Sequence, residues 1–130
     1  PVPVVGSVNS LYHTIFSLSA RRVDHARMGA MNLEALAWSM DEAMAARADI
    51  APTRLLDVRY DALTADPAAT VARVCAHTGL VVDMDAIQRS VESRPQHQHG
   101  RHTYTLEEAG LSERQVRARF ANYTAGFDLG

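Results

Sequence analysis

Residues 55–67 read LLDVRYDALTADP, and within this stretch the hydrophobic period changes from two to about four. Residues 56–60 alternate apolar and charged side chains, which predicts a β-strand. Asp66 followed by Pro67 predicts the start of a helix, because aspartate caps free N–H groups and proline fits a first turn. This is the only strand that the sequence predicts. A lone strand needs hydrogen-bond partners, so we expect a mostly helical chain whose sheet lies elsewhere.

Helical periodicity covers most of the remaining sequence. Five stretches carry apolar or small residues every three or four positions, and each is expected to bury that face. They are Val4, Val8, Leu11, Ile15 and Leu18; Leu33, Leu36, Ala37, Met40 and Met44; Val71, Val74, Cys75 and Thr78; Met84, Ile87 and Val91; and Val116, Phe120, Tyr123 and Phe127. Gly79 predicts a left-handed stop, Asp83 a cap, and Ser112 with Gln115 a capping box.

Composition narrows the class of protein. Thirteen Lys and Arg against fifteen Asp and Glu give a formal net charge of −2, which argues against a nucleic-acid partner. Cys75 is the single cysteine, so an internal disulfide is excluded and a cytoplasmic location is expected. We find no transmembrane run and no signal-peptide pattern. A chain that opens on Pro1 is expected to be a piece of a longer protein.

Residues 56–67 resemble a strand-to-helix segment of the sulfotransferases that use 3'-phosphoadenosine 5'-phosphosulfate (PAPS), in particular a bacterial branch common in actinobacteria. The family pattern is Val-Arg-Tyr-Glu-Asp-Leu-x-x-Asp-Pro, against VRYDALTADP in residues 58–67. In related enzymes this tyrosine packs at the adenine. The resemblance therefore implies that Tyr60 contacts the adenine of the sulfuryl donor.

Residues 1–8, PVPVVGSV, are similar to the family's Arg-Asp-Pro-x-x-x-x-x-Ser-Val segment, entered just after its arginine. In the family, that arginine and the serine hold the 3'-phosphate of the nucleotide. The resemblance gives the serine's role to Ser7 and places the arginine two residues before Pro1. An anion is favoured there, since Ser7 lies in the first turns of a predicted helix.

Residues 98–111, QHGRHTYTLEEAGL, resemble a Lys-His-Gly-Arg-His-x-Tyr-Ser-Leu stretch near the family's C-terminus. Gln98 replaces the lysine, which removes one positive charge. Arg101 can form two hydrogen bonds to a phosphate, Gly100 lets backbone N–H groups approach closely, and His99 adds a donor. The loop is therefore interpreted as an anion clamp.

The resemblance covers nearly the whole chain and implies an α/β, P-loop-NTPase-like sulfotransferase fold in the parent protein. Residues 1–130 would form the C-terminal part of a single domain, contributing the 3'-phosphate and adenine side of the PAPS site. The acceptor would carry a hydroxyl group, and no metal is implied. No Gly-x-x-x-x-Gly-Lys pattern and no general base of the family are found, so the isolated chain is expected to be inactive.

Other interpretations remain open for the same residues. Ser7 is also explained as a capping or solvent-facing residue, Tyr60 as a core residue, and the basic loop as simply solvated. His97, His99 and His102 suggest metal binding, but the neighbouring arginines oppose a cation. His13, His25 and His77 show no ligand spacing. A different function is a helical interaction module that associates, as an oligomer or with a partner, through an exposed apolar face.

Overall fold

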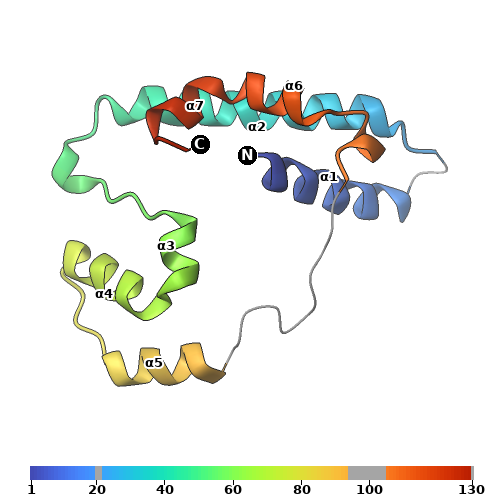
Figure 1. Ribbon diagram of the computed structural model, residues 1–130. Helices are drawn as coiled ribbons and strands as arrows, with labels where there is room; N and C mark the ends of the chain where they lie inside the picture. The colour runs from blue at the N-terminus through green and yellow to red at the C-terminus, as the bar shows by residue number, and fades with distance from the viewer. Residues whose placement is uncertain (20–21, 94–104, 130) are drawn as a thin grey trace. The chain divides into compact units, whose positions relative to one another are not determined.

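The computed structural model describes residues 1–19, 22–93 and 105–129. The chain divides into two compact units, residues 1–49 with 102–130 and residues 50–101. Every regular element in the described ranges is helical, so the expectation of a mostly helical chain is confirmed (Figure 1). No helix within these ranges is long and apolar enough to span a bilayer.

Two long helices, α1 (Val2–Ser17) and α2 (His25–Arg47), form the frame of the first unit. α1 opens with proline in its first turn, where the fixed φ of proline fits a helix. Asp24 caps α2 by accepting a hydrogen bond from the backbone N–H of Arg27 at 3.0 Å. The two helices pack against each other, and α2 also contacts the C-terminal elements (Figure 1).

The first unit closes with η2 (Glu107–Ala109), α6 (Glu113–Arg119) and α7 (Ala121–Gly126). The capping box is confirmed, because the side chains of Ser112 and Gln115 each bond the other's backbone N–H. The closing helix is broken at Phe120, whose φ of −98° and ψ of 14° interrupt regular α geometry. Arg119 of α6 pairs with two carboxylates of α2, Glu34 at 3.0 Å and Asp41 at 2.9 Å.

A buried apolar cluster holds the first unit together. It comprises Val5, Leu33, Ala37, Leu106, Ala109, Leu111, Val116 and Phe120. At its edge α2 approaches η2 so closely that a Cβ on Gly29 would overlap the carbonyl oxygen of Ala109. Gly110 follows η2 with a φ of +66°, a left-handed conformation that favours glycine. Close packing at this point therefore depends on two glycines.

The face that α1 buries differs from the expected one. Val4, Leu11 and Ile15 of the predicted stripe are 59%, 58% and 50% exposed, while Val5 and Asn9 are buried. Asn9 satisfies its polar groups by donating to the Val5 carbonyl at 2.9 Å and accepting from Asn32 at 2.9 Å. The prediction failed because α2 and the C-terminal elements cover a side of α1 with few large apolar residues. The apolar stripe of α2 is buried or half-buried as predicted.

The second unit contains short elements: η1 (Pro52–Arg54), α3 (Tyr60–Ala65), α4 (Pro67–Thr78) and α5 (Met84–Ser93). Asp66 caps α4 through the N–H of Ala69 at 3.0 Å, and Gly79 ends it with a φ of 72°. The capping role of Asp83 before α5 is likewise confirmed. Cys75 is buried, as expected for a packed thiol, whereas Thr78 is exposed.

The predicted strand at residues 56–60 is wrong. Leu55 and Arg59 do have extended backbone angles, but no second extended segment of the described residues pairs with this one. Arg73 of α4 instead donates to the Asp57 carbonyl at 2.6 Å. The extended angles at Leu55 and Arg59 agree with the alternation, but a strand also requires a neighbour that the local pattern does not specify.

Candidate functional site

Ser7 lies in the second turn of α1 and is half-buried. The N-terminus of this helix carries no side-chain cap, and the first intrahelical bond runs from the Val5 N–H to the Pro1 carbonyl at 3.0 Å. The N–H groups of the first turn have no intrahelical acceptor, and the helix dipole adds partial positive charge there. The local geometry therefore suits an anion.

A cavity of about 80 Å³ opens beside this turn of α1. Gly6 and Ser10 of α1 line it, whereas Ser7 does not. Thr105, which lies 95 residues after Ser10 in the sequence, lines it as well. The remaining lining residues are Asn9, His13, His25, Met28, Glu108 and Ala109. The fold thus brings the segment that follows the basic loop next to the turn that carries Ser7.

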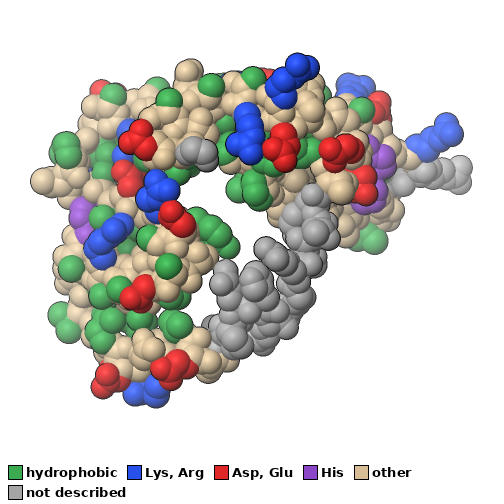
Figure 2. Space-filling view, in the orientation of Figure 1, with side chains coloured by type: hydrophobic (Ala, Val, Ile, Leu, Met, Phe, Trp, Pro, Cys, Tyr) green, Lys and Arg blue, Asp and Glu red, His purple; other side chains and the backbone are tan. Residues whose placement is uncertain are grey.

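Two imidazoles among the lining residues of this cavity contact each other. The Nδ1 atoms of His13 and His25 are 3.0 Å apart, and the rings stack with centroids 4.5 Å apart. Figure 2 shows the histidine side chains of this unit beside acidic ones. Sequence spacing failed to find the pair, because the two residues lie on different helices and the loop between them sets their separation.

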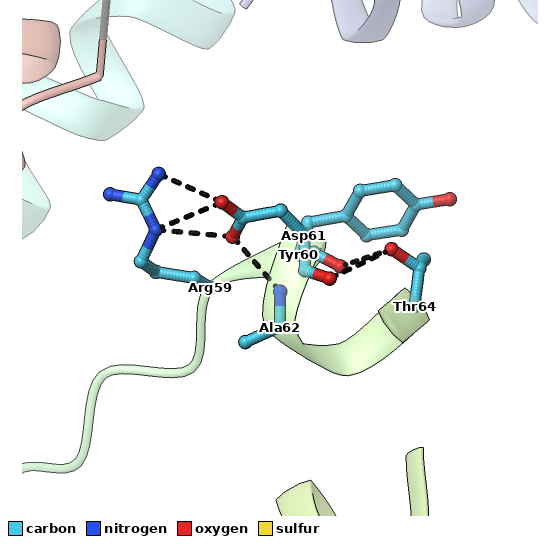
Figure 3. Close-up of polar contacts among 5 residues, drawn as sticks. All are labelled: Arg59, Tyr60, Asp61, Ala62 and Thr64. Atoms are coloured by element: carbon cyan, nitrogen blue, oxygen red, sulfur yellow. Dashed lines mark hydrogen bonds and ion pairs between the residues drawn. The ribbon is translucent and has the colours of Figure 1, made fainter. Parts of the chain in front are cut away.

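Tyr60 is the first residue of α3, so the prediction that it ends a strand is wrong. Its side chain is 76% exposed and projects away from a pair formed by its two neighbours (Figure 3). Arg59 binds the carboxylate of Asp61 through Nε at 3.1 Å and Nη2 at 3.0 Å. These bonds, and one from the Ala62 N–H, hold the pKa of Asp61 below its ordinary value.

The backbone around Tyr60 is fixed by three further bonds. The Thr64 hydroxyl lies 3.0 Å from the carbonyl oxygens of both Tyr60 and Asp61 (Figure 3). On the preceding side, the guanidinium of Arg73 holds the Asp57 carbonyl. An exposed aromatic ring on a constrained backbone is suited to contact a flat ligand.

The structure does not bring all the predicted site residues into one described site. Ser7 belongs to the first unit and Tyr60 to the second. His99, Gly100 and Arg101, as well as the rival metal ligands His97 and His102, lie outside the described residues. Within the described ranges, no three His, Cys, Asp or Glu side chains are grouped to hold a metal ion.

Comparison with known proteins identifies the family. The model of the sulfotransferase family matches residues 3–85, which is more than half of the chain. The chain belongs to the sulfotransferase family. The matched range holds α1, α2 and the segment around Tyr60, and thus both described candidate residues.

The fold is similar to a crystal structure of a sulfotransferase from Mycobacterium avium, with a TM-score of 0.83 and 22% sequence identity. The alignment covers 97% of the present chain and 33% of the mycobacterial chain. The chain therefore spans about a third of the length of that structure. No curated protein matches the sequence significantly.

Proposed function

We propose that this chain supplies the 3'-phosphate and adenine side of a PAPS site, in a protein that transfers the sulfuryl group to a hydroxyl acceptor. Ser7 and Arg101 bind the 3'-phosphate, His99 and Gly100 assist, and Tyr60 packs against the adenine. Anion binding and positioning are the main tasks of a protein in such transfers. No metal takes part in this scheme.

The observation that carries the proposal is that Gly6, Ser10 and Thr105 line one cavity. Arg101 precedes Thr105 by four residues, and four residues of chain span at most about 14 Å. The proximity of Arg101 to Thr105 in the sequence therefore supports the proposal that Arg101 acts at the same phosphate site. A hydroxyl and a guanidinium are suited to bind a phosphate, and the partial positive charge at the start of a helix adds to the attraction.

In the proposed parent protein, the extended segment before Tyr60 joins the sheet of an α/β sulfotransferase fold. The present chain covers 33% of the mycobacterial chain. A parent protein of similar length has further segments that supply the other strands of this sheet. The Gly-x-x-x-x-Gly-Lys pattern is absent from the 130 residues, and we propose that they do not catalyse transfer alone. The buried Cys75, which forms no disulfide, accords with a proposed cytoplasmic location.

Titration with adenosine 3',5'-bisphosphate by calorimetry tests the proposal. We expect saturable binding, weakened about tenfold by Ser7→Ala and by Arg101→Ala, because each loses a hydrogen bond to a charged phosphate. Ser17→Ala, at the other end of α1, and Arg114→Ala are matched controls that should leave the affinity unchanged. Equal affinities for Ser7→Ala and Ser17→Ala would contradict the proposed phosphate site.

One observation favours a second function, a helical module that associates through an apolar face. Val4, Leu11 and Ile15 lie exposed along α1 at intervals of seven and four residues. Sedimentation velocity across a range of protein concentrations tests it. The second function would replace the first if the folded chain associates but does not bind the nucleotide, and if Leu11→Glu abolishes the association.

A further inference from the structure

The contact between His13 and His25 has no role in the proposed nucleotide site. Their Nδ1 atoms lie 3.0 Å apart, and their ring planes are inclined by 21°. A neutral imidazole carries a proton on one ring nitrogen and a lone pair on the other, so one Nδ1 donates this bond and its partner accepts it. Neutral imidazole is also the commonest metal ligand in proteins. Two such nitrogens on different helices therefore form a candidate chelate.

The packing of α1 on α2 holds the two rings in place. His25 is the first residue of α2, directly after the capping Asp24, and His13 lies in the C-terminal half of α1. One turn before His13, Asn9 accepts a hydrogen bond at 2.9 Å from Asn32, two turns after His25. Two polar contacts thus follow one helix–helix interface. A metal site needs ligands that the fold positions in advance, and helices position them more precisely than loops do.

The separation of the two nitrogens selects the kind of ion. Imidazole nitrogens bind transition metals at about 2.0–2.1 Å, and two nitrogens 3.0 Å apart then subtend about 91–97° at the ion. A tetrahedral angle would require nitrogens about 3.3–3.4 Å apart. A right angle is typical of the tetragonal coordination of Cu²⁺ and Ni²⁺, and Cu²⁺ binds nitrogen sites more tightly than Ni²⁺ or Zn²⁺ does. The distance therefore favours Cu²⁺.

The cavity beside the pair has room and polar groups for the remaining ligands. Its volume of about 80 Å³ exceeds the roughly 30 Å³ that one water molecule occupies in the liquid. Ser10, Thr105 and Glu108 line it, and their oxygen atoms are acceptors for water molecules bound to an ion. Water therefore completes a coordination shell for which the described residues group no third His, Cys, Asp or Glu with the pair.

The charges around the cavity favour a cation. Among its described lining residues, only Glu108 carries a formal charge when the imidazoles are neutral. The nearest arginines in the sequence, Arg22 and Arg27, line a different cavity of about 490 Å³ between α1 and α2. The Asp24 carboxylate, next to His25 in the sequence, offsets part of the positive end of the α2 dipole. The lining of the cavity beside the pair therefore attracts a divalent cation.

We propose that His13 and His25 form a two-histidine site for a divalent transition-metal ion, with Cu²⁺ as the best fit. Each ring binds the ion through Nδ1, and water occupies the other positions. The ring that donates the hydrogen bond exchanges its Nδ1 proton, through water, for one on Nε2, so both imidazoles stay neutral and no net proton is released. The ion joins α1 to α2 and therefore stabilises the first unit. This site is independent of the proposed nucleotide site.

Calorimetric titration of the full chain with CuCl₂, without nucleotide, tests the proposal, and electron paramagnetic resonance counts the bound nitrogens. We expect one ion per chain with two coordinated imidazoles, bound more tightly than Ni²⁺ or Zn²⁺. His13→Gln and His25→Gln should each weaken binding at least about tenfold, because each removes one of two protein ligands. His77→Gln, at an exposed histidine of α4, is the matched control and should leave the affinity unchanged. Circular dichroism verifies that the variants fold.

The basic loop supplies a rival set of ligands, His97, His99 and His102. Replacing all three by glutamine should leave the Cu²⁺ affinity and the two-nitrogen spectrum unchanged. If this replacement removes the site while His13→Gln leaves it intact, the ion binds the loop and the assignment to the helix pair is overturned. A spectrum with a single coordinated nitrogen would overturn the assignment as well.

Thermal unfolding distinguishes a bridge between the helices from binding at one ring. At a hundredfold excess of free Cu²⁺ over its Kd, the melting temperature of the full chain should rise by roughly 10 °C. Neither His13→Gln nor His25→Gln should show this rise, and an equal rise in either variant would contradict the bridge. The two proposals fail separately, because Ser7→Ala should weaken binding of adenosine 3',5'-bisphosphate and leave Cu²⁺ binding unchanged.

Discussion

The two units of the chain are stabilised in different ways. The first unit encloses a cluster of eight buried apolar residues contributed by α1, α2, α6 and the segment around η2. In the described part of the second unit, only Thr70 and Cys75 are buried, and Leu80 and Val81 are exposed. Packing dominates the first unit, whereas caps and local hydrogen bonds define the second.

This difference separates the two halves of the proposed nucleotide site. Ser7 sits on a helix anchored by Val5 in the buried cluster, so its position is fixed by non-local packing. Tyr60 sits in a unit whose small buried surface provides little hydrophobic stabilisation. The adenine side should therefore open more readily than the phosphate side.

The largest effect is expected at Gly29. A Cβ there would overlap the Ala109 carbonyl oxygen, and backbone cannot yield as a side chain does, so Gly29→Ala should destabilise the first unit by about 3 kcal/mol. Urea denaturation followed by circular dichroism measures this. Gly126→Ala is the control, because its Cβ would meet only the mobile end of Met44. Equal stability of the two variants would disprove the close approach of α2 to η2.

Val116 and Val81 compare the two units directly. Val116 is fully buried and Val81 fully exposed. Val116→Ala should cost about 2 kcal/mol, since it removes two buried methyl groups and leaves a cavity, while Val81→Ala should be nearly neutral. The same denaturation measurement applies. A loss of stability in Val81→Ala as large as in Val116→Ala would show that the second unit buries this residue.

The cap of α4 tests the local character of the second unit. Asp66→Ala removes the bond to the Ala69 N–H and should cost about 1 kcal/mol. We expect faster amide hydrogen exchange in α4, with protection in α2 unchanged. Loss of protection in both helices would mean that the two units unfold together, and the comparison drawn above would then be wrong.

The smallest effect concerns the acid dependence of the second unit. Hydrogen bonds from Arg59 hold the folded-state pKa of Asp61 below its ordinary value, so the stabilisation is present above that value. It is lost as the pH falls through the folded-state pKa. Carbon-detected NMR titration should show this lowered pKa, and Arg59→Gln should return it toward ordinary values. If the pKa of Asp61 were the same in Arg59→Gln, the hydrogen bonds from Arg59 would be excluded as the cause of the lowered pKa.

Local signals in the sequence predicted the helix ends correctly. Asp66, Gly79 and the Ser112–Gln115 box act through groups at most a few residues away, so the pattern contains all that is needed. The strand at residues 56–60 was not predictable in this way, because pairing depends on a distant segment. The backbone is extended at Leu55 and Arg59, but no second extended segment of the described residues lies beside it as a strand.

The same limit applies to the site. The position of Ser7 near the start of a helix was predictable from local sequence, but the face that α1 buries was not. The Asn9–Asn32 bond and the His13–His25 pair join residues 23 and 12 positions apart on different helices. Neither has a local signature, because the packing of α1 on α2 creates both. The function could therefore be inferred only from the resemblance to a family, and the cavities could be located only from the structure.

The central claim is that residues around Ser7, in the first unit, contact the 3'-phosphate of the nucleotide. NMR shift mapping tests it most directly, with adenosine 3',5'-bisphosphate compared with adenosine 5'-phosphate, which lacks that group. The account predicts that the bisphosphate shifts the amide signals of Gly6, Ser7, Ser10 and Thr105, and that the monophosphate leaves them nearly unchanged. Identical shifts with both nucleotides, or no shift at these four residues, would contradict it.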